Sequence, residues 1–119
     1  MKKNIIHVIY PAQTTIAFVH ECDETVETIL ELVFGMFNHG SCQESELFLK
    51  SKIRSLSVND IVCVNGRYFQ CAPVGWNEVS PEYVTQLEND VANAPMTSLH
   101  GPWFGLSEVM YARQKVQLV

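Results

Sequence analysis

Residues 55–76, SLSVNDIVCVNGRYFQCAPVGW, form the stretch of sequence that decides the fold. Asn65 and Gly66 are the preferred pair for a type I′ β-turn, because both central residues of that turn need positive φ. Across a two-residue turn the facing pairs are Val64 with Arg67, Cys63 with Tyr68, and Val62 with Phe69. The stretch therefore predicts a β-hairpin over 61–71. Cys63 and Cys71 fall on opposite faces of it, which argues against a disulfide between them.

Two strands and a helix are predicted upstream of this hairpin. Residues 5–10 are β-branched and end in an aromatic residue, which favours an interior strand, and residues 14–21 follow as a second strand after a turn at 11–13. A helix is predicted over about 23–38, with Asp23 as its cap and Gly40 as its stop. Its apolar stripe consists of Val26, Ile29, Leu30, Val33 and Phe37. Residues 41–54 fit either a short helix or an extended connector.

Two further helices are predicted in the C-terminal third. Ser80, Pro81 and Glu82 supply a cap, a proline at the first helical position and an early acid, so a helix begins there and runs over about 81–93. A final helix is expected over about 106–114. The predicted fold is a single α+β domain over 1–119. Its small, mostly antiparallel sheet, with the hairpin, is packed by the long N-terminal helix and the two C-terminal helices.

Composition and charge exclude several classes of protein. Hydrophobic residues make up 47% of the 119 residues and charged residues 18%, which is typical of a globular protein. The net charge of −5 argues against direct binding of nucleic acid, which needs a basic face. No apolar run approaches the ~20 residues that span a bilayer, and residues 5–10 are too short for a secretory signal. We therefore expect a cytoplasmic protein with reduced cysteines and no membrane contact.

Histidine and cysteine pairs give the best-looking metal pattern. His20 and Cys22 lie before the predicted N-terminal helix, and His39 and Cys42 lie after it. A helix over 23–38 would hold the two pairs ~24 Å apart, whereas zinc needs its ligands within ~2.3 Å. We predict no shared metal site.

Nucleophilic catalysis would fall to a cysteine. Cys71 is the candidate thiol, with His100 as a base, but it shares a hairpin face with Val62 and Phe69, so a buried structural role is favoured. Phosphate-binding loops and the usual nucleophile motifs are missing from the sequence. We expect neither an enzyme nor a cofactor. Trp76 is interpreted as a core residue, with a stacking platform as the alternative.

An interaction surface is the remaining candidate site. Between residues 21 and 46 the chain carries no lysine or arginine and seven acids, which are Glu21, Asp23, Glu24, Glu27, Glu31, Glu44 and Glu46. A solvated helix face explains such a run, and a surface for a basic partner is the sharper interpretation. The candidate surface residues are Glu24, Glu27 and Glu31 on the acidic helix, and Trp103 and Phe104 in a turn-rich segment.

The chain resembles the YodL-like group, small uncharacterised proteins of bacterial mobile elements. The matching features are Phe34, Phe37 and Asn38, then SLSVNDIV over 55–62, then Gly75 and Trp76. Asn59 stands where that group commonly has glycine, and asparagine also tolerates positive φ. The resemblance implies a gene carried on a conjugative element, plasmid, phage or integron cassette. It implies no activity and no catalytic residues.

Together these features predict a protein of unknown biochemical function. The first hypothesis is a non-catalytic binding or accessory protein encoded on a mobile genetic element, with an unknown protein as its partner. The alternative is an acidic decoy that binds a host protein that handles nucleic acid. The edges of a short sheet and the high hydrophobic content make a homodimer a further prediction.

Overall fold

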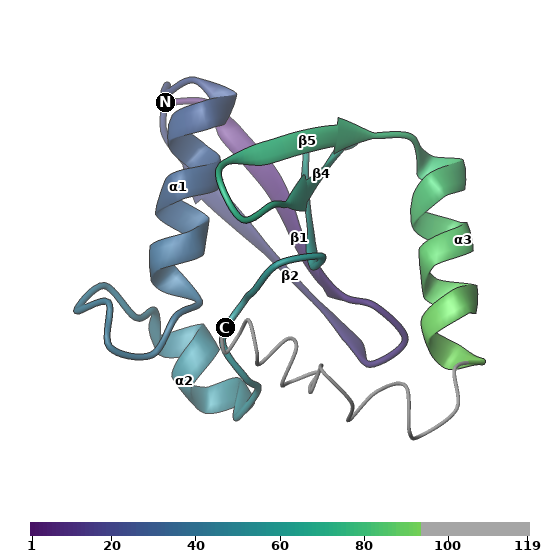
Figure 1. Cartoon of the computed structure of the whole chain (residues 1–119). Helices are drawn as coiled ribbons and strands as arrows, with labels where there is room; N and C mark the ends of the chain where they lie inside the picture. The colour runs from purple at the N-terminus through teal and green to yellow at the C-terminus, as the bar shows by residue number, and fades with distance from the viewer. Residues whose placement is uncertain (94–119) are drawn as a thin grey trace. The chain divides into compact units, whose positions relative to one another are not determined.

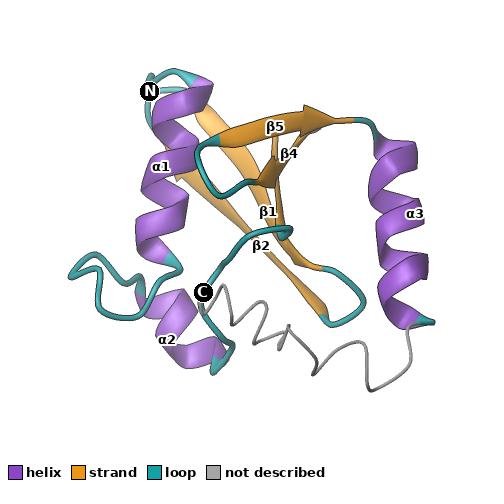
Figure 2. Ribbon diagram, viewed as in Figure 1, coloured by secondary structure: helices purple, strands orange, loops and turns teal. Residues whose placement is uncertain are grey.

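An antiparallel sheet of five strands dominates the structure, and short helices accompany it (Figures 1 and 2). The computed structural model describes residues 1–93. Its elements are β1 Lys3–Tyr10, β2 Thr14–Glu21, α1 Val26–Met36, α2 Glu46–Ser51, β3 Ile61–Val64, β4 Arg67–Cys71, β5 Trp76–Val79 and α3 Pro81–Ala92. The chain divides into a sheet unit, which holds Met1–Asp23 and the described residues from Ser57 onward, and a helical unit, Glu24–Leu56.

The order of strands in the sheet is β2-β1-β3-β4-β5, and all neighbours are antiparallel. The β1–β2 hairpin runs from the pair Lys3 and Glu21 to the pair Tyr10 and Thr14. Its turn at 11–13 is the predicted one, and Ala12 there has φ 60°. β3 pairs with the other side of β1. The N-terminal hairpin and the β3–β4–β5 meander therefore join at β1.

The predicted hairpin is confirmed, including its register. Asn65 and Gly66 have φ of 52° and 87°, as a type I′ turn requires. The facing pairs are Val64 with Arg67, Cys63 with Tyr68, Val62 with Phe69, and Ile61 with Gln70. The two-residue turn thus determines the register of the hairpin, and the register determines which side chains of β3 and β4 share a face.

The Asn65 side chain also ties this turn to β1. The side-chain Oδ1 of Asn65 accepts a hydrogen bond from the Ile5 N–H at 2.8 Å. The backbone N–H of Asn65 donates to the Ile5 carbonyl at 2.9 Å. Its Nδ2 donates at 3.0 Å to Oδ1 of Asn4, which is only 2% exposed. The Asn4 Nδ2 in turn donates to the carbonyls of His20 (3.0 Å) and Cys22 (3.1 Å). Two asparagines therefore connect β2, β1 and the β3–β4 turn.

The entry to β3 is a turn followed by a β-bulge. The Asp60 N–H donates to the Ser57 carbonyl at 3.0 Å, and Asn59 between them has φ 81°, as the third residue of a type II turn does. The Asn59 N–H then donates to the Cys71 carbonyl while the Cys71 N–H donates to the Asp60 carbonyl. Asn59 and Asp60 therefore both lie opposite Cys71. This is a β-bulge whose first residue, Asn59, has positive φ. The predicted tolerance of asparagine at this position is confirmed.

Helix α3 packs on one face of the sheet. Ser80 caps it, since its side chain accepts from the Tyr83 N–H, and Pro81 occupies the first turn as predicted. Val84 is buried with Ile9 and Ile61, and Tyr68, Val79 and Leu87 pack around this cluster. The opposite face carries buried side chains as well, which are Ile6, Val8, Tyr10, Val62, Val64, Phe69 and Cys71.

The helical unit is held by caps and by aromatic contacts. Thr25 caps α1 by accepting from the Thr28 N–H, and Ser45 caps α2 by accepting from the Phe48 N–H. The rings of Phe37 and Phe48 lie 5.4 Å apart, and both side chains are fully buried.

The predicted packing by a long N-terminal helix and two C-terminal helices is wrong. The helix expected over about 23–38 is the 11-residue α1, because Thr25 and not Asp23 is the cap, and the chain leaves the helix after Met36. The sheet is larger than expected, with five strands, so the α+β class fits only loosely. The ambiguous stretch 41–54 contains the short helix α2. The helix expected over about 106–114 lies outside the described residues.

Replacing Asn65 with glycine tests the link between the turn and β1. Glycine keeps the positive φ but removes two side-chain hydrogen bonds and leaves the buried Asn4 amide with fewer partners. We expect a loss of roughly 2 kcal/mol in the free energy of unfolding, measured by urea denaturation. Asn59→Gly is the matched control, because only backbone groups of Asn59 form hydrogen bonds at the bulge. It should change stability by less than about 1 kcal/mol. Equal losses in the two variants would show that the Asn65 side chain contributes nothing beyond its turn.

Candidate functional site

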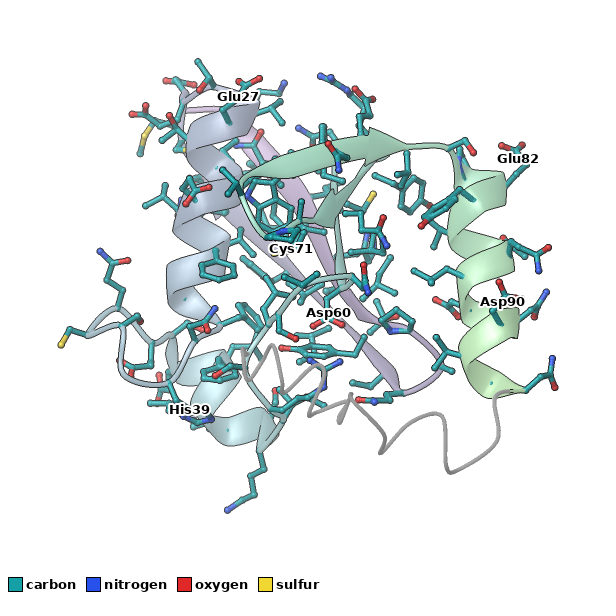
Figure 3. All side chains as sticks on the ribbon, in the orientation of Figure 1. Glu27, His39, Asp60, Cys71, Glu82 and Asp90 are labelled. Carbon is teal, nitrogen blue, oxygen red and sulfur yellow. The ribbon has the colours of Figure 1, made fainter. Side chains whose placement is uncertain are left out.

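The acids predicted from the sequence as a surface lie on α1 and just before it. Ile29, Leu30, Val33 and Gly35 are the buried residues of α1, whereas Glu27 and Glu31 on the helix, and Glu24 before its cap, are exposed. Figure 3 shows Glu27 at the start of the helix with its side chain directed outward. Glutamate in the first turn suits the positive end of the helix dipole. The helical period thus places apolar and acidic side chains on different sides of α1.

Several of the other acids between residues 21 and 46 have partners of their own. The Asp23 carboxylate accepts from the Lys2 N–H at 2.9 Å, and Glu46 forms an ion pair with Lys50 at 3.2 Å. The Glu44 carboxylate accepts from the Gly40 N–H at 2.6 Å. Hydrogen bonds from backbone N–H groups, its own first, lower the Glu44 pKa, and His39 lowers it further. These acids serve local structure.

Glu24 and Glu27 differ from those acids. In the part of the chain that the structure describes, neither forms an ion pair or a side-chain hydrogen bond. Glu27 and Glu31 are four residues apart, so the two carboxylates lie on the same side of α1. We define Glu24, Glu27 and Glu31 as the acidic surface.

The histidines and cysteines of the metal pattern are divided between the two units. His20 and Cys22 belong to the sheet unit, and His39 and Cys42 to the helical unit. The His39 ring packs against Phe48, with centroids 4.6 Å apart, and the His39 backbone N–H donates to the Ser55 hydroxyl. Over residues 1–93, no three His, Cys, Asp or Glu side chains come together as metal ligands.

Cys71 and Cys63 are buried in the sheet. Cys71 is 5% exposed, and its thiol lies 3.8 Å from the Ala72 carbonyl, which it can reach as a weak donor. Cys63 is 3% exposed, and burial raises the pKa of its thiol, although the Gly66 backbone and the Tyr68 side chain lower it in part. A nucleophilic cysteine needs an accessible thiolate. The surroundings of these two thiols are those of core residues. His100, the base suggested for Cys71, lies outside the described residues.

The remaining candidate residues are less informative. Trp76 is half-buried in the short strand β5. Trp103 and Phe104 lie outside the described residues. None of the helices within 1–93 is long and apolar enough to cross a bilayer.

One polar feature at the entry to β3 was not identified as a buried site from the sequence. Asp60 is 3% exposed, and its Oδ2 accepts from the Ser57 N–H at 2.8 Å (Figure 3). Ser57 and Asp60 belong to one turn, in which the Asp60 side chain accepts from a backbone N–H, as aspartate commonly does at turns. Their burial carried no sequence signal, because burial at a turn depends on the strands that pack around it. Asp60 completes the turn before β3.

Thiol labelling tests this description of the cysteines. Cys42 is exposed and Cys22 is half-buried, whereas Cys63 and Cys71 are buried. Iodoacetamide added to the native protein, followed by mass mapping, should modify Cys42 first and Cys22 more slowly. Cys63 and Cys71 should react only after denaturation. Rapid labelling of Cys71 in the native protein would instead make it a candidate nucleophile.

The pKa of Cys63 gives a pH dependence with a definite sign. Its pKa is raised above the ordinary value of 9.0, so the native state keeps the thiol protonated where the unfolded chain would ionise it. The resulting stability is present below about pH 9 and is lost as the pH rises toward the folded pKa. Urea denaturation at a series of pH values should show that the free energy of unfolding of the wild type falls, relative to that of Cys63→Ala, above pH 9. A difference independent of pH would contradict the raised pKa.

Comparisons with known proteins give no match: no protein-family model, curated protein or solved structure is significantly similar to this chain.

Proposed function

We propose that the chain is a non-catalytic binding or accessory protein encoded on a mobile genetic element, and that it binds a basic protein partner through the acidic surface. The observation that carries this proposal is the exposure of Glu24 and Glu27 on a segment that has no lysine or arginine between residues 21 and 46. An isolated anionic surface attracts cationic partners and accelerates their association.

The spacing of the acidic surface supports a partner with several positive charges. Residues three and four apart on a helix have Cβ atoms about 5–6 Å apart, so Glu27 and Glu31 present neighbouring carboxylates. A partner carrying a row of lysine or arginine side chains would engage this side of α1 through the exposed carboxylates of Glu24 and Glu27. Each exposed pair contributes at most about 1 kcal/mol, so affinity would depend on several such pairs together.

The environment of the thiols supports a non-catalytic role. Cys63 and Cys71 are both buried, and burial raises the pKa of Cys63, which further disfavours its thiolate form. We include a cytoplasmic location in the proposal, since all four cysteines are free and a reducing compartment keeps them so. The mobile-element context rests on the resemblance to the YodL-like group.

A decoy role is the second candidate, and the acidic surface favours it too. The carboxylates of the acidic surface, at the start of α1 and just before it, present several negative charges close together in sequence, and a nucleic-acid-binding protein likewise recognises the negative charges of a phosphate backbone. In that case the chain would occupy the basic site of a host protein. Competition with nucleic acid distinguishes this role from binding at another basic surface.

Charge-neutral variants with a matched control test the proposal. The immobilised double variant Glu24→Gln/Glu27→Gln is compared with wild type and with Glu82→Gln/Asp90→Asn in a pull-down from host lysate. The control removes the same charge from α3, where Glu82 and Asp90 are both exposed and Figure 3 shows Glu82 directed outward. A partner of the acidic surface should be lost from the first variant by at least about tenfold, which corresponds to ~1.4 kcal/mol, and kept by the control.

Salt and competitor separate the outcomes. Capture should weaken between roughly 50 and 500 mM salt, because exposed charges are screened. Added duplex DNA should release the partner of a decoy and leave any other partner bound. Equal capture by wild type and both variants would overturn the proposal that the acidic surface binds a partner.

A further inference from the structure

Strand β2 forms one edge of the sheet, and the backbone N–H and C=O groups of every second residue point away from β1. Ile5 bonds with Asn65 on the β3 side, through both its N–H and its carbonyl. Backbone groups alternate sides along an antiparallel strand, so the even-numbered residues of β1 bond with β2. The bond from the Cys22 N–H to the Lys2 carbonyl continues that ladder. The outward-pointing residues of β2 are therefore Thr15, Ala17, Val19 and Glu21.

This edge lacks the usual protection against pairing. Edge strands are ordinarily kept apart by shortness, proline, lysine or a bulge. β2 is eight residues long, holds none of those residues, and pairs with β1 in an unbroken register. Glu21, at its last position, is the one Asp, Glu, Lys or Arg in the strand. Within residues 1–93, no strand pairs with its outer side.

An exposed apolar pair lies beside this edge. Ile5 and Val19 face each other across β1 and β2, and they are 54% and 56% exposed. Ala17, the next outward residue on the same face, is also exposed. The α3 cluster covers this face at Ile9 and Ile61, at the other end of β1. An apolar strip therefore reaches the open edge.

We propose that β2 pairs antiparallel with β2 of a second copy of the chain, about a two-fold axis through Ala17, so that two five-stranded sheets form one continuous sheet. Outward-pointing residues must face outward-pointing residues, which allows Ala17 to face the partner's Ala17 and Thr15 to face the partner's Val19. Pairs of β-branched residues such as Thr and Val stabilise neighbouring strands. This goes beyond the proposed function, because it uses the sheet unit and not the acidic surface.

The charges permit a second copy in this register despite the net charge of −5. Glu21 lies four residues from the axis, so the two Glu21 side chains would be ~27 Å apart at a rise of ~3.4 Å per residue. That distance exceeds the Debye length of ~8 Å at physiological salt, and their repulsion is screened. A second copy also brings an equal apolar strip to the same face, since a two-fold axis makes the interface self-complementary.

The size of the interface sets the expected strength. One strand pair with a short apolar strip falls at the lower end of protein interfaces, below ~1,200 Å², where complexes are weak and reversible. We therefore expect a dimer with a dissociation constant in the micromolar range. Its mass should depend on concentration.

Sedimentation equilibrium of the full chain tests the proposal. From about 1 to 500 µM, a concentration range that brackets micromolar affinity, the weight-average mass should rise from 13.5 kDa toward twice that value. Val19→Lys places a charge on the pairing edge and should weaken the dimer by at least about tenfold. Val74→Lys is the matched control, because Val74 is 92% exposed in the loop before β5, and it should dimerise like wild type.

A proline variant tests strand pairing itself. Ala17→Pro removes an outward N–H and leaves the ladder with β1 intact, because proline is tolerated where the N–H of an edge strand faces solvent. It should be monomeric throughout the concentration range, with a wild-type circular dichroism spectrum. If this variant fails to fold, Val19→Lys decides the question. A wild type that stays at 13.5 kDa, or a dimer that persists in folded Ala17→Pro or in Val19→Lys, would overturn the proposal.

Discussion

The hydrogen bonds of Asn65 are the constraint on which the rest of the sheet depends. The two locally formed parts of the sheet, the β1–β2 hairpin and the β3–β4–β5 meander, join along a single line between β1 and β3. A slip of one residue along that line would send the buried side chains of β3 to the other face. Asn65 opposes such a slip because it bonds to both the N–H and the carbonyl of Ile5, and Asn4 extends the connection to β2.

The parts of the fold that the sequence predicts well are those decided by neighbouring residues. Asn65 and Gly66 dictate their own turn, and a two-residue turn leaves one register for the hairpin. Ser80 and Pro81 mark the start of α3 in the same local way. The strands at 5–10 and 14–21 follow from a short apolar run and a turn.

The errors concern choices that tertiary packing makes. Asp23 is as good a cap as Thr25 by residue type, but its carboxylate is bonded to the Lys2 N–H in the sheet unit. β5 was missed because Asn77 and Glu78 at its centre are exposed and polar, so it lacks the pattern of a buried strand. Its pairing is supported by Arg67, which binds Glu78 through two hydrogen bonds of 2.9 and 3.1 Å.

The candidate site was predictable in composition and less so in detail. The absence of basic residues between 21 and 46 is visible in the sequence, as is the helical spacing of Glu27 and Glu31. Which acids are engaged elsewhere is not visible, because the Gly40 N–H beside Glu44 depends on how the loop after α1 folds back. The Ile5 and Val19 strip likewise needs the β1–β2 register and the position of α3 before it can be seen as exposed.

The insertion of the helical unit between β2 and β3 has a consequence for biosynthesis. As the nascent chain leaves the ribosome, β1 and β2 can pair early, but the third strand follows only after the whole of Glu24–Leu56 has been translated. Closing so long a loop carries an entropic penalty and makes this the slow contact of the fold. Until then β1 presents an open edge of its own. Chaperones that shield such edges would therefore act during that interval.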